Sequence, residues 1–199
     1  MMQLPDSDLV RTAYRHVSAR LPEAVKNHSV RVARLSSLIG ESERALLNGE
    51  LLWVAGLFHD VGTSVGAESP ERFEVVGAHE AAAFLRRHTA YDDGAVQEVW
   101  DAIALHTSPH IPEARGGLAR AIRLGVLMDF GEDVLDGSAS IRAQLEAEAP
   151  RLDIETVLAD AVVAQAIARP EKAPPASWPH DLYASHLEDP HRGGVNPAF

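Results

Sequence analysis

Apolar residues recur every three or four positions along most of the chain, which is the spacing of one face of a helix. Polar residues that suit metal binding stand within these apolar stripes or at their ends. They are His28 within the stripe 25–39, His59 and Asp60 directly after the apolar segment 51–58, His106 at the end of the stripe 96–106, and Asp129 at the end of the stripe 122–129. Because an unpaired buried His or Asp is costly, we expect these residues to share a partner. A divalent cation is the simplest partner for side chains that converge from four helices.

The same periodicity predicts helix after helix over about the first 165 residues. No segment alternates apolar and polar residues with β-branched enrichment, so no strand is expected. The predicted helices cover residues 8–19, 22–39, 44–61, 75–88, 95–106, 118–130, 141–149 and 153–168, with loops at 63–73 and 108–117. The sequence therefore predicts an all-α fold.

The composition changes after residue 168, where six prolines interrupt the last 30 residues. We therefore divide the chain into a helical domain of residues 1–168 and a Pro-rich C-terminal tail of residues 169–199. This tail is expected to be partly docked on the domain or disordered. The side chains that favour docking are Trp178, Leu182, Tyr183 and Phe199.

At 199 residues, with 46% apolar and 24% charged residues, the chain has the composition of one globular domain with its own core. It contains no stretch of about 18 apolar residues, and its N-terminus lacks the features of a signal peptide. The absence of cysteine excludes disulfides and thiolate chemistry. We therefore expect a cytoplasmic protein.

The net charge of −11 argues against nucleic acid or an anionic membrane as a main partner. We expect a small-molecule substrate instead. The sequence leaves open whether the chain forms a homo-oligomer.

His59 and Asp60 are adjacent at the predicted end of a helix, where two side chains about 100° apart can both reach one ion. Imidazole with carboxylate suits zinc, manganese, iron or cobalt. A ligand set of His28, His59, Asp60 and Asp129 would leave positions for water and a substrate atom. Such a metal lowers the pKa of its water to about 7, which provides a nucleophile at neutral pH.

Each of these signals also has an ordinary explanation. A single His on an apolar helix face is usually a hydrogen-bonded core residue, and the dipeptide His-Asp is common by chance. Asp129 could be a helix-terminal residue facing solvent. The order of the residues and their shared inward orientation favour the metal site.

That order matches the HD-domain superfamily of metal-dependent hydrolases, which the chain resembles over about residues 20–135. The segment 56–62, Gly-Leu-Phe-His-Asp-Val-Gly, is a close match. The resemblance implies an all-α HD-domain helical bundle in which one metal ion is held by four residues. These are His28, His59, Asp60 and Asp129, while His79 and His106 match positions that bind a second metal or the substrate in many members.

Within the superfamily the chain is most similar to the cyanamide-hydratase-like branch, through the segments 59–63, 72–78 and 101–107. Members of this branch resemble a zinc enzyme that adds water to cyanamide to give urea. The resemblance therefore implies a hydrolase or hydratase that uses a metal-activated water on a small molecule, such as a cyanamide or nitrile. Zinc is the expected metal, with iron, manganese, cobalt and nickel as alternatives.

The chain departs from the phosphohydrolase members, which often carry a lysine shortly after the His-Asp pair. Thr63 stands at that position, and only two lysines occur in the chain, Lys26 and Lys172. Because a lysine would offer phosphate a point charge, its absence disfavours a nucleotide substrate. The arginines that could replace it are Arg72, Arg86 and Arg123.

We assign two catalytic candidates. Asp60 could both bind the metal and accept a proton from water, and His79 could contact the substrate or donate a proton. Four further residues are predicted to bind substrate. They are His106, Thr63, Arg72 and Phe73.

Three alternatives remain open. A phosphohydrolase, as a phosphodiesterase or nucleotidase, would need an arginine cluster facing the metal. A di-iron oxygenase would need both His79 and His106 on metal. A non-enzymatic module would use the His-Asp site structurally, with no open coordination position.

Overall fold

The computed structural model describes residues 4–191, and these residues form ten α-helices and two short 3-10 helices without a strand. The predicted all-α class is confirmed. The elements are α1 (Asp8–Ser18), α2 (Glu23–Ser42), α3 (Gly49–Phe58), η1 (Val61–Thr63), α4 (Phe73–His88), α5 (Asp93–Leu105), α6 (Ile111–Arg115), α7 (Gly117–Asp129), α8 (Ser138–Glu148), α9 (Ile154–Ala168), η2 (Pro170–Lys172) and α10 (Trp178–Glu188). Among the described residues no helix combines the length and the hydrophobicity needed to span a membrane.

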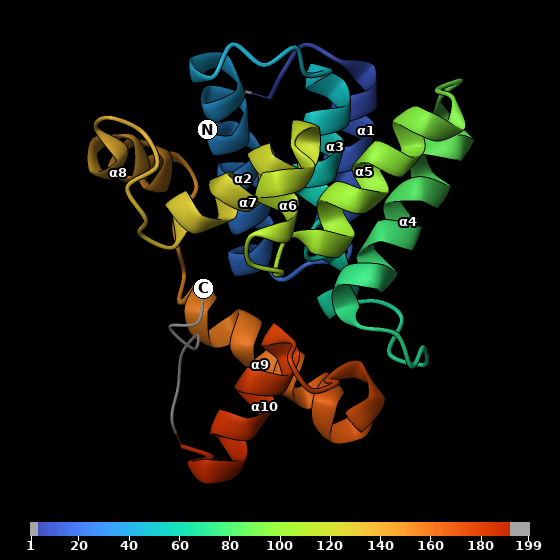
Figure 1. The fold of residues 1–199 in the computed structure, drawn as a ribbon, viewed down its shortest axis with the longest axis vertical. Coiled ribbons are helices and arrows are strands. Elements are labelled where there is room, and N and C mark those ends of the chain that lie inside the picture. The colour runs from blue at the N-terminus through green and yellow to red at the C-terminus, as the bar shows by residue number, and fades with distance from the viewer. Residues whose placement is uncertain (1–3, 192–199) are drawn as a thin grey trace.

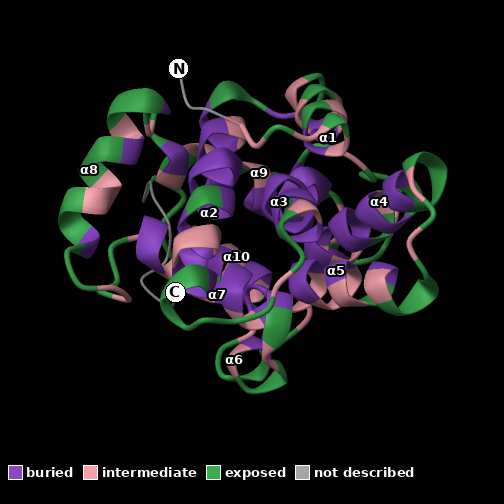
Figure 2. Cartoon of the chain, turned by 90° about the horizontal axis from the view of Figure 1, so that it is seen from above, coloured by how far each residue is buried: buried purple, intermediate pink, exposed green. Residues whose placement is uncertain are grey.

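Helix α2 lies at the centre of the bundle, where it packs against both α3 and α7, while α4 packs against α5. In Figure 1 the helices α9 and α10, coloured orange to red, lie below this bundle. Figure 2 shows that buried residues are concentrated on α2, α3 and the facing sides of α4, α5 and α7. The site residues predicted from the sequence lie on these helices or directly next to them.

Two glycines allow α2 to approach its neighbours closely. A Cβ on Gly56 of α3 would lie 2.7 Å from Cα of Ala33, and one on Gly125 of α7 would lie 2.2 Å from Oγ of Ser36. Since real Cβ atoms do not come so close to other heavy atoms, a larger residue at either position would push the helices apart. These crossings bring the three helices that carry His28, His59 and Asp129 together.

The structure corrects the predicted limits of α2 and α3. Helix α2 was expected to stop at Gly40, but it continues to Ser42, and the chain reverses at Arg44 in the left-handed region (φ 53°). Helix α3 then begins at Gly49, because the side chain of Asn48 accepts hydrogen bonds from the first amides of the helix. The predicted helix 44–61 is therefore shorter at both ends.

Two further helices lie where none was predicted. The short α6 (Ile111–Arg115) stands within the predicted loop 108–117. Helix α10 lies in the segment predicted as the Pro-rich tail, and its Trp178 and Leu182 are buried. Phe199 lies outside the described residues, and the division of the chain at residue 168 stays a prediction.

Candidate metal centre

Three buried side chains offer ligand atoms around one point. Nε2 of His28 and Nε2 of His59 lie 3.1 Å apart. Oδ2 of Asp60 lies 3.4 Å from the first nitrogen and 3.1 Å from the second. All three side chains are at most 1% exposed. The structure thus brings together three of the four residues that the sequence predicted as metal ligands.

His59 and His106 are held by the same local device. Each is the residue that directly follows a helix, and each Nδ1 lies 2.7 Å from the carbonyl oxygen three residues earlier, that of Gly56 or Ile103. The last carbonyls of a helix lack amide partners, so the imidazole satisfies one of them. Because a carbonyl oxygen only accepts, Nδ1 donates to it, and Nε2 is left as the ring nitrogen that faces the cluster.

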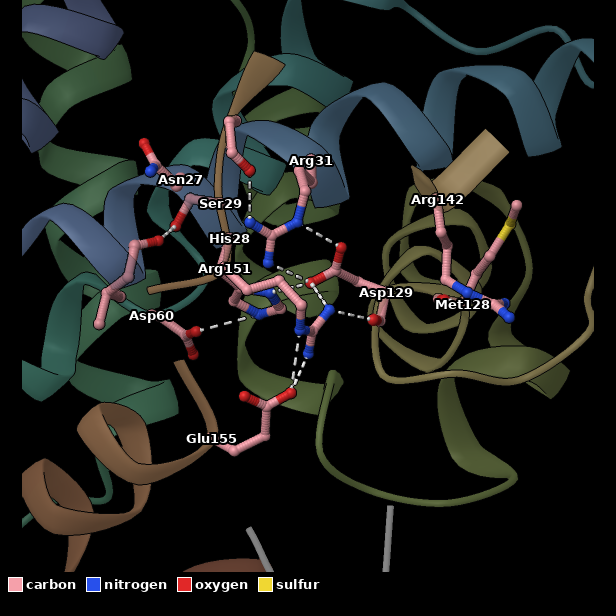
Figure 3. A network of polar contacts seen from close by, with 12 residues as sticks. Asn27, His28, Ser29, Arg31, Asp60, Met128, Asp129, Arg142, Arg151 and Glu155 are labelled. Atoms are coloured by element: carbon pink, nitrogen blue, oxygen red, sulfur yellow. Dashed lines mark hydrogen bonds and ion pairs between the residues drawn. The ribbon is translucent and has the colours of Figure 1, made fainter. Parts of the chain in front are cut away.

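His28 reaches the same state through a carboxylate. Its Nδ1 lies 2.8 Å from Oδ2 of Asp129, as the polar network in Figure 3 shows. Burial lowers the pKa of His28, which favours the neutral ring. The ring therefore donates from Nδ1 to Asp129 and presents the lone pair of Nε2 to Asp60.

Asp129 itself lies behind His28 and does not join the cluster. Its Oδ1 accepts a hydrogen bond from Nε of Arg31 at 2.7 Å, and its Oδ2 accepts one from the same guanidinium at 2.8 Å. Arg151 donates to the backbone carbonyl of Asp129 at 2.8 Å. The carboxylate predicted as a metal ligand thus contacts His28 and Arg31 in this structure, and its predicted role as a ligand stays a prediction.

Arg31 is a functional candidate that the sequence analysis missed. It is fully buried, and it also donates to the carbonyl oxygen of Ala149 at 2.9 Å. A signal for it existed, because Arg31 follows His28 by three residues and so lies on the same helix face. An arginine on an inward face predicts a buried carboxylate partner.

The arrangement fits a cation. Oδ2 of Asp60 is buried without a hydrogen-bond partner in the described structure, and Nε2 of His28 and Nε2 of His59 face each other across 3.1 Å. Burial raises the pKa of Asp60, but its contacts with His59 and His106 outweigh burial and hold that pKa well below its ordinary value. An ionised carboxylate and facing imidazole lone pairs form a divalent-metal donor set.

The other predicted site residues surround this cluster in part. Nε2 of His106 lies 3.5 Å from Oδ1 of Asp60, on the other oxygen of that carboxylate. Thr63 is buried, and its hydroxyl donates to the carbonyl of Asp60 at 2.7 Å. Phe73 lies between the rings of His106 and Trp178, with centroids 5.8 and 6.0 Å away. Helix α10 thus contacts a residue that contacts the site.

Arg72 is held by an internal carboxylate. Its guanidinium pairs with Glu74, which is fully buried, and donates to the hydroxyl of Thr107 at 3.0 Å. Thr107 in turn donates to Glu74 at 2.6 Å. The guanidinium therefore connects the start of α4 with the residue after His106, and its charge is balanced before any substrate arrives.

The structure does not bring His79 to the cluster. Its side chain is 56% exposed, and its partners are Trp100, which donates to its Nδ1 at 3.2 Å, and Glu71. Its predicted role as a proton donor or substrate contact gains no support from this position.

A cleft of about 960 Å³ lies elsewhere, between the N-terminal segment, α2, α3 and α8. Its walls include Arg34, Glu50, Trp53 and Tyr91, and none of the cluster residues lines it. We assign the chemistry to the cluster, because its buried groups need a ligand and the polar wall of the cleft is internally hydrogen-bonded through Glu50 and Tyr91.

A family model described as HD domain matches residues 25–165, and the chain belongs to this family. HD domains are generally metal-dependent hydrolases, and the cluster of His28, His59 and Asp60 fits the metal site that such an enzyme requires. Comparison with curated proteins gives no match. The family match does not distinguish branches, so the resemblance to the cyanamide-hydratase-like branch stays a prediction.

Proposed function

We propose that the protein is a metal-dependent hydrolase or hydratase that acts with a metal-activated water on a small neutral molecule, such as a cyanamide or nitrile. One observation carries the proposal. The imidazoles of His28 and His59 are fixed through Nδ1 so that both Nε2 atoms meet at the unpartnered oxygen of Asp60.

Within this proposal His28, His59 and Asp60 hold the metal, with zinc as the expected ion. His106 faces the second oxygen of Asp60 and is available as a further ligand or as a substrate contact. Asp129 and Arg31 keep the His28 ring in its orientation and tautomer.

A bound divalent metal would supply Lewis acidity, which lowers the pKa of water and polarises an electrophilic group. The chain's own residues would handle the proton. Because the low pKa of Asp60 makes its carboxylate a weak base, Oδ1 of Asp60 would hold the proton only in passing, and Nε2 of His106, 3.5 Å from that oxygen, would receive it. Burial of the whole cluster excludes bulk water and strengthens these interactions.

The charges around the cluster support a neutral substrate. Each arginine that contacts a cluster residue or its neighbour is already balanced by a carboxylate. Arg31 pairs with Asp129, Arg72 pairs with Glu74, and Arg123 pairs with Glu113 while donating to the carbonyl of His106. A phosphate would have to compete with these internal carboxylates for its cations.

Metal content is the first test. We would purify the wild type without chelators, together with His59→Ala and the control His88→Ala, which removes an exposed histidine of α4, and measure metals by elemental mass spectrometry. The proposal expects about one divalent metal ion per chain in the wild type and the control, and none in His59→Ala. No metal in any of the three proteins would refute the proposal.

The reaction is tested by assaying the metal-loaded protein against cyanamide and small nitriles in parallel with nucleotides and phosphodiesters. Turnover of the neutral substrates, absent in His59→Ala and present in His88→Ala, is the expected result. Turnover of phosphate esters alone would move the assignment to a phosphohydrolase. Two irons per chain would instead favour the di-iron oxygenase and require a movement of His79.

A further inference from the structure

The loop that follows the His-Asp pair, residues 62–71 and here called the carbonyl loop, turns its backbone oxygens toward the C-terminal part of the chain. Three side chains donate to them. Gln165 donates to the carbonyls of Gly62 and Thr63 at 2.8 and 2.9 Å. Arg169 donates to the carbonyl of Ala67 at 3.1 Å. The side chains of Gln165, Arg169 and Lys172 are here called the C-terminal clamp. Together they donate hydrogen bonds to six backbone oxygens of this loop.

Lys172 makes the central contact. Its ammonium donates to the carbonyls of Gly66, Ser69 and Glu71 at 3.2, 3.2 and 2.8 Å, so each of its three protons has an acceptor. The residue is only 3% exposed. Lysine is rarely buried to this degree, and here the loop closes around its charge. Burial, with the nearby charge of Arg169, lowers the pKa of Lys172.

Both ends of the carbonyl loop lead into the metal centre. It begins two residues after Asp60 and includes Thr63, which donates to the carbonyl of Asp60. Its last residue precedes Arg72 and Phe73, which contact Thr107 and His106. The loop is therefore linked at both ends to residues that contact the cluster.

The clamp is connected to a second contact over the site. Five residues after Lys172, Ser177 caps the start of α10, and the indole of the first helical residue, Trp178, packs against Phe73. Phe73 is 2% exposed and contacts His106. The segment from Gln165 to Trp178 thus contacts the carbonyl loop through the clamp residues, and it contacts Phe73, the neighbour of His106, through Trp178.

We propose that Gln165, Arg169 and Lys172 are positioning residues that hold the carbonyl loop closed over the metal centre and so control the access of metal and small molecules to it. The proposal rests on the proposed function, because it regulates the same site. Release of the clamp opens the loop between Thr63 and Arg72 while the helices that carry His28, His59 and His106 stay in place.

The test compares Lys172→Met, which keeps the length of the apolar stem, with the matched control Lys26→Met, which removes the other lysine of the chain. Hydrogen exchange measured by mass spectrometry on the metal-free full-length proteins reports on the loop. We expect the amides of residues 62–71 to exchange about 10- to 100-fold faster in Lys172→Met, as hydrogen bonds to a charged group are lost, and at the wild-type rate in the control. Unchanged exchange in Lys172→Met would overturn the proposal.

Metal release gives the second readout. The zinc-loaded proteins are mixed with a chromogenic chelator, and the rate of zinc transfer is recorded. Lys172→Met should release zinc about tenfold faster than the wild type and the control, with helix content unchanged by circular dichroism. Faster loop exchange with an unchanged release rate would show that the loop does not cover the site and would also overturn the proposal.

Gln165→Ala keeps the proposal testable if Lys172→Met fails to fold, since it removes two neutral hydrogen bonds and leaves the buried ammonium in place. The same direction of change, smaller in size, is expected for both readouts. Failure of the proposed function gives a different result. The wild type would then bind no metal, while its hydrogen exchange would still show whether Gln165 and Lys172 restrain the carbonyl loop. In that case the exchange rates alone decide, and equal rates in variant and wild type refute the clamp.

Discussion

At the scale of single residues, Asp129 and Asp60 differ in their hydrogen-bond partners, although the sequence predicts both as metal ligands. Asp129 has both oxygens occupied by Arg31 and His28. Asp60 keeps one buried oxygen without a hydrogen-bond partner in the described structure. A carboxylate with a full set of partners stabilises the fold, whereas one left short of partners marks a position for a ligand. The two residues should therefore respond differently to the same substitution.

Asp129→Asn is expected to destabilise the metal-free protein by about 3–5 kcal/mol, because it leaves the charge of Arg31 buried without a counter-ion. Asp60→Asn should cost less in the same measurement, since its Oδ2 loses no hydrogen bond and no buried guanidinium is left without a counter-ion. Urea unfolding of both variants in the presence of a chelator measures these costs.

Zinc affinity should show the reverse order. Asp60→Asn removes a ligand, while Asp129→Asn acts through the orientation of His28 and is expected to weaken binding about 10- to 100-fold. If Asp129→Asn left the metal-free protein as stable as wild type and abolished zinc binding, Asp129 would be a direct ligand, as the sequence alone had suggested.

The contribution of Asp129 to stability should depend on pH. Burial raises the pKa of Asp129, but the hydrogen bonds from Arg31 and His28 outweigh burial, and the pKa is lowered in the folded protein. The ionised form therefore contributes stability above about pH 4, the ordinary value for an unfolded chain, and this contribution is lost as the pH falls toward the folded-state pKa. Urea midpoints of the metal-free protein between about pH 6 and about pH 3 should fall more steeply for wild type than for Asp129→Asn. Parallel curves would contradict this assignment.

At the scale of helices, the close crossing of α2 and α3 at Gly56 sets the distance between His28 and His59. Gly56→Ala would place a Cβ 2.7 Å from Ala33, so the helices must separate. We expect a loss of about 1–3 kcal/mol in stability and weaker zinc binding, because the 3.1 Å separation of the Nε2 atoms of His28 and His59 depends on this crossing. Equilibrium unfolding and zinc titration measure the two effects.

Gly49→Ala is the matched control for Gly56→Ala. It lies at the start of the same helix, and a Cβ there meets nothing within 4 Å. This variant should be as stable as wild type or gain up to about 1 kcal/mol, because alanine favours the helix. Equal losses in both variants would mean that the loss of stability is not specific to the crossing of α2 and α3.

The helices that carry the site were predictable because their stripes are strongly periodic, but their ends were not. Glycine usually marks a helix end, yet Gly40 is buried inside α2, and Arg44 takes the left-handed position that glycine normally fills. Helix α10 is not predicted from the sequence, because Pro179 is expected to interrupt a helix. Proline is well tolerated in the first turn of a helix, however, and Pro179 stands there.

The site was predictable to the extent that periodicity defines a face. His28, His59 and Asp60 interrupt clearly apolar stripes, and these are the residues that meet. His79 lies among alanines, which fit either face, and the structure places it on the exposed side of α4 together with Ala83. The place of Arg31 on an inward helix face indicates a buried carboxylate partner, but its pairing with Asp129 does not follow from the spacing, because the two residues are 98 positions apart.

At the scale of the whole molecule, the residues of the proposed metal site come from separate parts of the chain. His28 comes from the middle of α2, while His59 and His106 follow the ends of α3 and α5. The apolar core extends well beyond these residues, since it includes buried side chains of α1, α4, α9 and α10. A fold with such a core should persist without the metal, and the metal should add stability by mass action.

Chelation tests this distinction between a catalytic and a structural site. At a free metal concentration about 100 times the Kd, binding adds about 2.7 kcal/mol, which for a chain of this size corresponds to about 5–10 °C in Tm. We expect a chelator to lower the Tm of wild type by that amount and to leave the helical spectrum at 25 °C unchanged. His59→Ala should show no shift, and His88→Ala should behave like wild type. Loss of the helical spectrum on chelation would mean instead that the metal holds the fold together, as in a structural site without an open coordination position, and the catalytic assignment would fall with it.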